Sequence, residues 1–347
     1  MRARVNVGVH VTPVTMSELA GHHSPVWREA TVQLTHAASE WSASELFSDA
    51  MPDRPSCRNL SVAVAALAVL VAAGCGGDDS SDVAAPPPSS PVIEDPGPIH
   101  VHGLGVNPKD GALFIATHTG LFRAEAGSGP ERVAGRYQDT MGFTIVGADR
   151  FLGSGHPDGR EKLPPFLGLI RTTDAGDNWK PVSLLGERDF HVLEAAGKRV
   201  YGFGTDFASR RPGFLVSSDG GRSWDERAVP EPLIALAIDP EDPERIIANG
   251  EQGVFLSSDG GRTWRPIEGP AGLLAWTKDG LTVVDQEGAV QSADEPGRRL
   301  SSVGDVGGPP AALDSGPNGD LYVALHDGVI KRSEDGGRNW SVRSKPE

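Results

Sequence analysis

The sequence has few cysteines, few aromatic residues and too little positive charge for several common functions. Its 347 residues include only two cysteines, Cys57 and Cys75, and both precede the repeats described below. The repeat region therefore forms no disulfide and carries no thiol chemistry. The formal net charge of −15 argues against a nucleic-acid reader, which needs a basic surface. It also argues against purely electrostatic docking to an anionic membrane.

Long apolar runs are missing as well. The most apolar stretch, residues 60–73, is too short to span a bilayer comfortably. It follows Met51 and two arginines, and it ends in Ala72-Ala73-Gly74-Cys75, which resembles a bacterial lipobox. That resemblance implies cleavage before Cys75 and a lipid on its thiol, with the protein exported and anchored to the outer face of the bacterial cytoplasmic membrane. An ordinary signal peptide or a short anchor is the alternative.

Composition divides the chain into four segments. Residues 1–50 show no sustained apolar period, and the signal begins naturally at Met51. We therefore expect 1–50 to be a misassigned, unstructured start and 51–75 to be a lipoprotein signal peptide. Residues 76–98 are rich in Asp, Ser, Ala and Pro, which predicts a disordered tether. The repeats occupy residues 99–347.

A repeated turn dominates the remaining sequence, in which Gly and Pro are abundant. The pattern Ser/Thr-x-Asp-x-Gly-x-x-Trp predicts a tight β-hairpin. Its Asp carboxylate can accept backbone N–H groups, its Gly supplies a positive φ, and its Trp starts the return strand and buries an apolar ring. The four copies carry Asp174 and Trp179, Asp219 and Trp224, Asp259 and Trp264, and Asp335 and Trp340.

The spacing of these turns predicts the fold. Trp264 follows Trp224 by 40 residues, and Trp340 follows Trp264 by 76, which is two periods. Degenerate copies of the repeat in residues 292–300 and 120–133 bring the total to six units. A period of this size with four short strands per unit is typical of an all-β propeller, so we expect six four-stranded blades, with seven as the alternative. In the fourth unit the strands are expected at residues 233–238, 245–248, 254–257 and 263–267.

The turn resembles the Asp-box, or BNR repeat, of sialidase-like and related β-propellers. In that family the box lies on the outer part of the blade, away from the active centre. The motifs His100-Val101-His102-Gly103, Met141-Gly142-Phe143 and Gly155-His156-Pro157 further resemble exported bacterial Asp-box proteins labelled glycosylhydrolase-like. The repeat form also resembles propellers of the photosystem-assembly-factor type, which work by binding proteins.

Histidines mark a candidate site. Six follow Cys75, and all map to the start of an innermost strand or the end of a second strand, which adjoin in a blade. Their blades also adjoin around the ring, so we expect the imidazoles to gather on one arc of one face. Such clusters commonly bind zinc or copper, and the thioether of Met141 in the same arc favours copper(I). Polar channel residues bound to backbone and water are the alternative. The candidate ligands are His100, His102, His118, Met141, His156, His191 and His326.

No enzyme signature accompanies these histidines. A glycosidase needs two carboxylates across a cleft, and the weak candidates are Asp158, Asp206 and Glu251. Tyr201 and Tyr322 lie within second strands, which argues against a sialidase nucleophile. We therefore favour a binding module for a metal, a small ligand, a glycan or a protein partner over a glycoside hydrolase-like enzyme.

Overall fold

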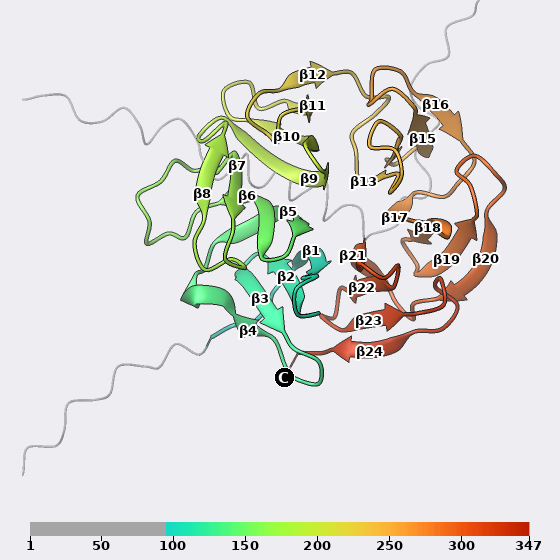
Figure 1. Cartoon of the computed structure of the whole chain (residues 1–347), viewed down its shortest axis with the longest axis horizontal. Coiled ribbons are helices and arrows are strands. Elements are labelled where there is room, and N and C mark those ends of the chain that lie inside the picture. The colour runs from blue at the N-terminus through green and yellow to red at the C-terminus, as the bar shows by residue number, and fades with distance from the viewer. Residues whose placement is uncertain (1–94, 347) are drawn as a thin grey trace, which may run out of the picture. The chain divides into compact units, whose positions relative to one another are not determined.

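Six antiparallel sheets of four consecutive strands form a ring in the computed structural model, which describes residues 95–346 (Figure 1). The predicted all-β, six-bladed propeller is confirmed. The expected signal peptide and Cys75 lie outside the described residues. Within residues 95–346, no helix is long and apolar enough to cross a membrane.

The strands that contain histidines belong to the first three blades, and His326 of blade 6 follows the second strand of that blade. Blade 1 consists of β1 (Val101–Val106), β2 (Leu113–Thr117), β3 (Gly120–Ala124) and β4 (Glu131–Arg132), followed by a 3-10 turn, Val133–Gly135. Blade 2 consists of β5 (Asp139–Gly147), β6 (Arg150–His156), β7 (Leu169–Thr172) and β8 (Lys180–Ser183). Blade 3 consists of β9 (Arg188–Ala196), β10 (Arg199–Asp206), β11 (Pro212–Ser217) and β12 (Asp225–Arg227).

The remaining blades repeat this pattern and complete the ring. Blade 4 consists of β13 (Ala235–Ile238), β14 (Ile246–Asn249), β15 (Val254–Ser257) and β16 (Arg265–Ile267). Blade 5 consists of β17 (Gly272–Thr277), β18 (Gly280–Asp285), β19 (Ala289–Ala293) and β20 (Ser301–Asp305). Blade 6 consists of β21 (Pro310–Ser315), β22 (Leu321–Leu325), β23 (Ile330–Ser333) and β24 (Ser341–Ser344).

The four strands expected in blade 4 are all present, with small shifts at their ends. β15 has the predicted bounds, whereas β13 begins two residues later than predicted and β14 is displaced by one. The outer strand β16 begins at Arg265 and not at Thr263, because Thr263 and Trp264 belong to the turn. In each of the four copies the Trp lies one residue before the outer strand, which corrects the expectation that it starts that strand.

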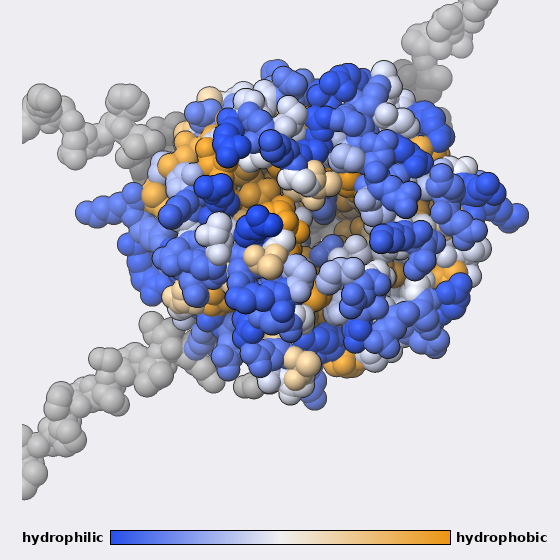
Figure 2. Space-filling model, viewed as in Figure 1, coloured by the Kyte–Doolittle hydropathy of each residue, from blue (hydrophilic) through white to orange (hydrophobic). Residues whose placement is uncertain are grey.

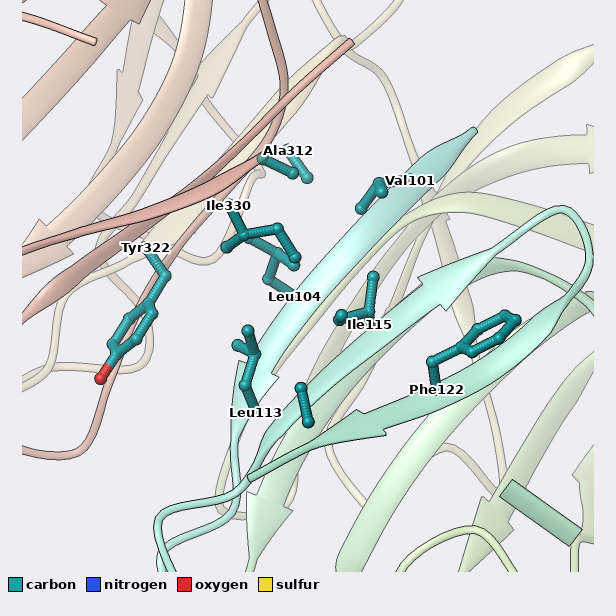
Figure 3. Close-up of a cluster of buried hydrophobic side chains, with 10 residues drawn as sticks. Val101, Leu104, Leu113, Ile115, Phe122, Ala312, Tyr322 and Ile330 are labelled. Atoms are coloured by element: carbon teal, nitrogen blue, oxygen red, sulfur yellow. The ribbon is translucent and has the colours of Figure 1, made fainter. Parts of the chain in front are cut away.

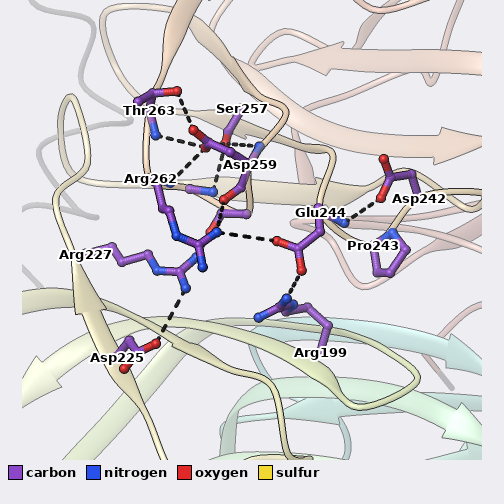
Figure 4. Close-up of polar contacts among 12 residues, drawn as sticks. Arg199, Asp225, Arg227, Asp242, Pro243, Glu244, Ser257, Asp259, Arg262 and Thr263 are labelled. Carbon is purple, nitrogen blue, oxygen red and sulfur yellow. Dashed lines mark hydrogen bonds and ion pairs between the residues drawn. The ribbon is translucent and has the colours of Figure 1, made fainter.

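The repeated turn has the hydrogen bonds predicted for it, as blade 4 shows (Figure 4). Asp259 Oδ1 accepts the backbone N–H groups of Arg262 and Thr263 at 3.0 and 2.9 Å. Ser257 Oγ accepts the Gly261 N–H at 2.8 Å. Gly261 has φ +85, and a Cβ there would lie 2.7 Å from Phe214 Cε1 of blade 3. The turn therefore needs glycine both for its backbone and for its contact with the preceding blade.

Ring closure depends on side-chain packing between blades 1 and 6. β1 lies against β21, and a buried cluster joins the two blades (Figure 3). Arg343 of β24 also donates hydrogen bonds to the carbonyls of Ala124 and Glu125, at 3.1 and 3.0 Å. No described strand is exchanged between the first and last blades, as the in-phase repeats predicted. The cluster includes Val101, Leu104, Leu113, Ile115, Phe122, Ala312, Tyr322 and Ile330.

Candidate functional site

A central channel runs between the six innermost strands, β1, β5, β9, β13, β17 and β21 (Figure 1). The space-filling view shows the corresponding hollow in the middle of the ring (Figure 2). Its cavity has a volume of about 120 Å³. The side chains of His102, Met141 and His191 line it, together with Glu194 and Asp314. Most of the other lining side chains are apolar, among them Leu104, Phe143, Leu193, Leu236 and Leu274.

Asp139, the first residue of β5, brings together two histidines of blade 1. His118 Nδ1 donates a hydrogen bond to Asp139 Oδ2 at 2.9 Å. His102 Nε2 lies 3.6 Å from Asp139 Oδ1, and both atoms are buried without a hydrogen-bond partner among the described residues. A buried polar atom without a hydrogen-bond partner lowers the stability of the fold. These two atoms are therefore available to bind an ion or a ligand. His118 is 59% exposed, which leaves the pair open to solvent on one side.

Asp189, the second residue of β9, brings together one histidine of blade 2 and one of its own strand. His191 Nε2 donates to Asp189 Oδ2 at 3.0 Å, and His156 Nε2 lies 3.4 Å from that oxygen. The Nδ1 of His156 donates to the Pro165 carbonyl at 2.8 Å. Asp189 is only 2% exposed, and its Oδ1 has no partner among the described residues. We call these six residues the histidine basin: His102, His118, Asp139, His156, Asp189 and His191.

Burial and the pairing of imidazole with carboxylate shift the pKa values of these groups in opposite directions. The pKa of His102 is lowered to about 4, chiefly by burial, with the charge of His191 acting in the same direction and that of Asp139 against it. The hydrogen bond that His118 donates to Asp139 raises the pKa of His118. For His191, burial lowers the pKa, but the charge of Asp189 and its hydrogen bond outweigh burial and raise it. The same pairing lowers the pKa of Asp189 despite its burial. His102 is thus a neutral imidazole at pH 7, which is the form that binds metals.

Three basin residues have the arrangement of a metal site. Single ligand atoms of His102, His118 and Asp139 all lie within 4.8 Å of one another. Two imidazoles and a carboxylate at such distances are donors for zinc or for another first-row transition metal. Three atoms this close need shift by only about 1–2 Å to share one ion at a distance of about 2 Å.

The other predicted ligands lie at different distances from this group. The ring centre of His100 is 6.1 Å from that of His118, so His100 borders the basin. Met141 lies on β5 two residues after Asp139 and lines the channel beside the basin. His326 follows β22 and is exposed, and its backbone N–H donates to the Pro309 carbonyl. No contact of its side chain with another histidine is found in residues 95–346.

The weak carboxylate candidates are bound to structural partners or are exposed. Asp158 accepts hydrogen bonds from Arg160 and from the Tyr137 N–H, and the Arg160 contact holds its pKa well below the usual range. Asp206 accepts the Ser209 hydroxyl and N–H at 2.7 and 2.8 Å, which lowers its pKa. Glu251 is exposed in the turn after β14. Asp158 and Asp206 are therefore poor proton donors, since both stay ionised at neutral pH.

Four carboxylates of the site were missed by the sequence analysis. Asp139 and Asp189 hold the histidines, and Glu194 and Asp314 line the channel. Burial raises the pKa of Asp314 to about 7 and also raises that of Glu194. The sequence did contain a signal for Asp139 and Asp189. His100-x-His102, Asp139-x-Met141 and Asp189-x-His191 occupy equivalent positions at the start of three innermost strands.

Comparisons with known proteins support the fold and nothing finer. No protein-family model matches the sequence, and the search of curated proteins found no relative. A gluconolactonase from Xanthomonas campestris superposes with a TM-score of 0.51 at 13% identity, over 72% of this chain and 87% of that one. A GH74 xyloglucanase from the same species gives 0.47 at 18% identity, over 71% and 45%. YCF48 bound to a D1 peptide gives 0.41 at 18% identity, over 59% and 68%. At such identities the similarity shows a β-propeller alone.

Proposed function

We propose that this protein is an exported, lipid-anchored propeller that binds a transition-metal ion in its histidine basin. The observation that carries the proposal is the convergence of His102, His118 and Asp139 within 4.8 Å, with two of their atoms buried and unpartnered among the described residues. Zinc(II) and copper(II) are the ions that two imidazoles and a carboxylate suit best. The exposure of His118 gives an ion a way in from solvent.

The second pair of histidines supports the same interpretation. A histidine that binds a metal usually donates its other ring N–H to a carbonyl or a carboxylate. The Nδ1 of His156 already donates to the Pro165 carbonyl, which leaves its Nε2 lone pair facing the basin when the ring is neutral. His191 uses Nε2 for Asp189 and keeps Nδ1 free. Such contacts fix the orientation of the imidazoles before an ion arrives.

The point at which the chain enters the propeller relates the basin to the expected tether. Residues 95–99 lie beside the loop that carries His118. The His118 N–H donates to the Ile99 carbonyl at 3.0 Å, and Thr119 Oγ1 donates to the Gly97 carbonyl at 2.6 Å. Arg132 holds Asp95 through two hydrogen bonds. The chain therefore enters the propeller next to the basin. A lipid on Cys75 would hold the basin within a tether's length of the membrane, in keeping with the resemblance to exported Asp-box proteins.

A glycoside hydrolase-like activity is less well supported. Asp158 and Asp206 are committed to partners, and the channel cavity of about 120 Å³ is small beside the roughly 300–1,000 Å³ typical of small-molecule sites. An ion that has exchanged most of its waters for protein ligands needs far less space than a sugar ring. The size of the cavity therefore favours an ion over a glycan.

Metal analysis of the purified full chain tests the proposal. We expect about one equivalent of zinc or copper after dialysis, removed by a chelator and restored by titration. Asp139→Asn should weaken zinc binding at least about tenfold. His326→Ala should leave it within about threefold, because His326 contacts no basin residue in the described structure. A chain that binds neither metal would overturn the proposal, and the basin would then be a site for a small ligand.

A further inference from the structure

The same irregularity occurs in the innermost strands of blades 6, 1, 2 and 3. In each, the pairing with the second strand skips one residue, which is a β-bulge. In β1, for example, Val101 pairs with Thr117 and Gly103 with Ala116, so His102 is left over. The described innermost strands of blades 4 and 5 pair without a shift. The residues bulged near the strand starts are His102, Met141, His191 and Ala311, and β5 has a second shift further along, at Val146.

All four residues bulged near the strand starts line the central cavity. A bulge bends its strand and redirects a side chain, and bulges are common next to functional sites. Here three adjacent blades use the bulge to direct an imidazole, a thioether and a second imidazole into one space. Blade 6 presents only the methyl group of Ala311. Among the bulged residues, side-chain donor atoms are therefore confined to β1, β5 and β9.

Glycines next to the bulged residues bring these three strands close together. Gly103 follows His102, and a Cβ there would lie 3.3 Å from the Phe143 Cβ of β5. Gly142 follows Met141, and a Cβ there would lie 2.6 Å from the Phe190 carbonyl of β9. Any side chain at Gly142 would push β5 away from β9. The backbone is thus built for close approach at the level of the three donors.

The donor atoms of this set are available. His191 donates Nε2–H to Asp189, which leaves its Nδ1 as a lone-pair donor. His102 Nε2 is buried with no partner in the described structure. Met141 is the only methionine after residue 51, and this half-buried residue lines the same cavity as His102 and His191. Thioether and imidazole together are soft donors, which select copper(I) over zinc(II).

We infer that His102, Met141 and His191 form a copper(I) site in the channel. This inference rests on the proposed function, because it assigns a particular ion and ligand set to the same basin. His102 is shared by two sets of donors. Zinc takes His102 with His118 and Asp139 at the exposed edge, whereas copper(I) takes His102 with the thioether and His191 further in.

Competition titrations distinguish the two sets. The full chain is titrated anaerobically with copper(I) against a chromophoric copper(I) chelator, and separately with zinc(II). Met141→Leu keeps the size and apolar character of the side chain but removes the sulfur. We expect this variant to bind copper(I) at least about tenfold more weakly and zinc(II) within about threefold of the unchanged chain. X-ray absorption should detect a sulfur ligand of copper that disappears in Met141→Leu.

Matched variants and the remaining outcomes complete the test. His326→Ala controls for loss of a histidine outside the set and should leave copper(I) binding unchanged. Asp139→Asn should weaken zinc binding more than copper(I) binding. The inference is overturned if Met141→Leu binds copper(I) as tightly as the unchanged chain, or if copper shows only nitrogen and oxygen ligands. Zinc binding that depends on Asp139 would then leave the proposed function standing, whereas binding of neither ion would remove both.

Discussion

Asp139 of blade 2 and His118 of blade 1 are joined across the blade boundary by a hydrogen bond of 2.9 Å. Asp189 of blade 3 and His156 of blade 2 are related in the same way, at 3.4 Å. In both pairs the histidine lies at or one residue past the end of a second strand, and the aspartate is the first or second residue of the next innermost strand. The basin therefore contains the same kind of contact between neighbouring blades twice. It forms only when the blades assemble into the ring, and no single repeat contains it.

The first prediction concerns this contact in the metal-free protein. A double-mutant cycle with His118→Ala and Asp139→Asn should give a coupling free energy of about 0.5–1 kcal/mol, small because His118 is largely exposed. Urea unfolding in the presence of a chelator measures it. Strictly additive effects of the two substitutions would mean that the contact contributes nothing without a bound ion.

The second prediction concerns the repeated turn. Asp259→Ala should lower the free energy of unfolding by about 1–2 kcal/mol at pH 7, because two turn N–H groups lose their acceptor. Hydrogen bonds from Thr263 lower the pKa of Asp259 to about 2. A lowered pKa stabilises the fold above the unfolded value near 4, and that contribution disappears as the pH falls through about 2.

The difference in the free energy of unfolding between Asp259→Ala and the unchanged chain should therefore become smaller at acid pH. Asp279→Ala is the matched control, since Asp279 is exposed in a turn outside the repeated pattern. Denaturation curves at pH 7 and near pH 3 provide the comparison. Metal binding should not change in either variant. Equal losses from both substitutions would contradict a special role for the Asp259 carboxylate.

The third prediction concerns the buried carboxylate of the channel. Burial raises the pKa of Asp314 to about 7, whereas the unfolded chain titrates near 4. Between these values the folded protein holds a proton that the unfolded chain has released. The free energy of unfolding should therefore fall as the pH rises from about 4 to 7.

Asp314→Asn removes this titration while keeping the side-chain shape. Relative to the unchanged chain, the variant should gain stability on the order of a few kcal/mol between pH 4 and pH 8. The charge of Asp314 also raises the pKa of Glu194, so the comparison reports the loss of the Asp314 titration together with the change in that of Glu194. Urea unfolding across this pH range, with Asp279→Asn as the control, measures the effect. If the free energies of unfolding of Asp314→Asn and the unchanged chain changed with pH in parallel, the prediction would be wrong.

The fourth prediction concerns Cys75, which lies outside the described residues. Cys75→Ala should abolish incorporation of a labelled fatty acid and release the protein or stall its export. Cys57→Ala is the matched control and should keep the label, because it lies before the expected cleavage point. Unchanged membrane retention of Cys75→Ala would point to a plain anchor.

The sequence alone determined the architecture. The turn at Asp259 needs only its own Ser, Asp and Gly to close, so its pattern survives in the sequence and repeats at the length of one blade. Six repeats of that length predicted six blades. The same phase placed His118, His156 and His326 at equivalent strand ends, which the structure confirms.

Only the tertiary structure decided which residues meet. Asp139 and Asp189 stand at positions equivalent to His100, but their roles could not be predicted, because their partners lie on a neighbouring blade or depend on the register of an innermost strand. The bulges that direct His102, Met141 and His191 into the channel are set by the pairing of first and second strands. His326 shares the strand-end position of His118 but faces a blade that offers no carboxylate like Asp139 at the start of its innermost strand, where His100 stands instead. Such pairings depend on contacts between segments far apart in the chain, and a repeat pattern does not predict these contacts.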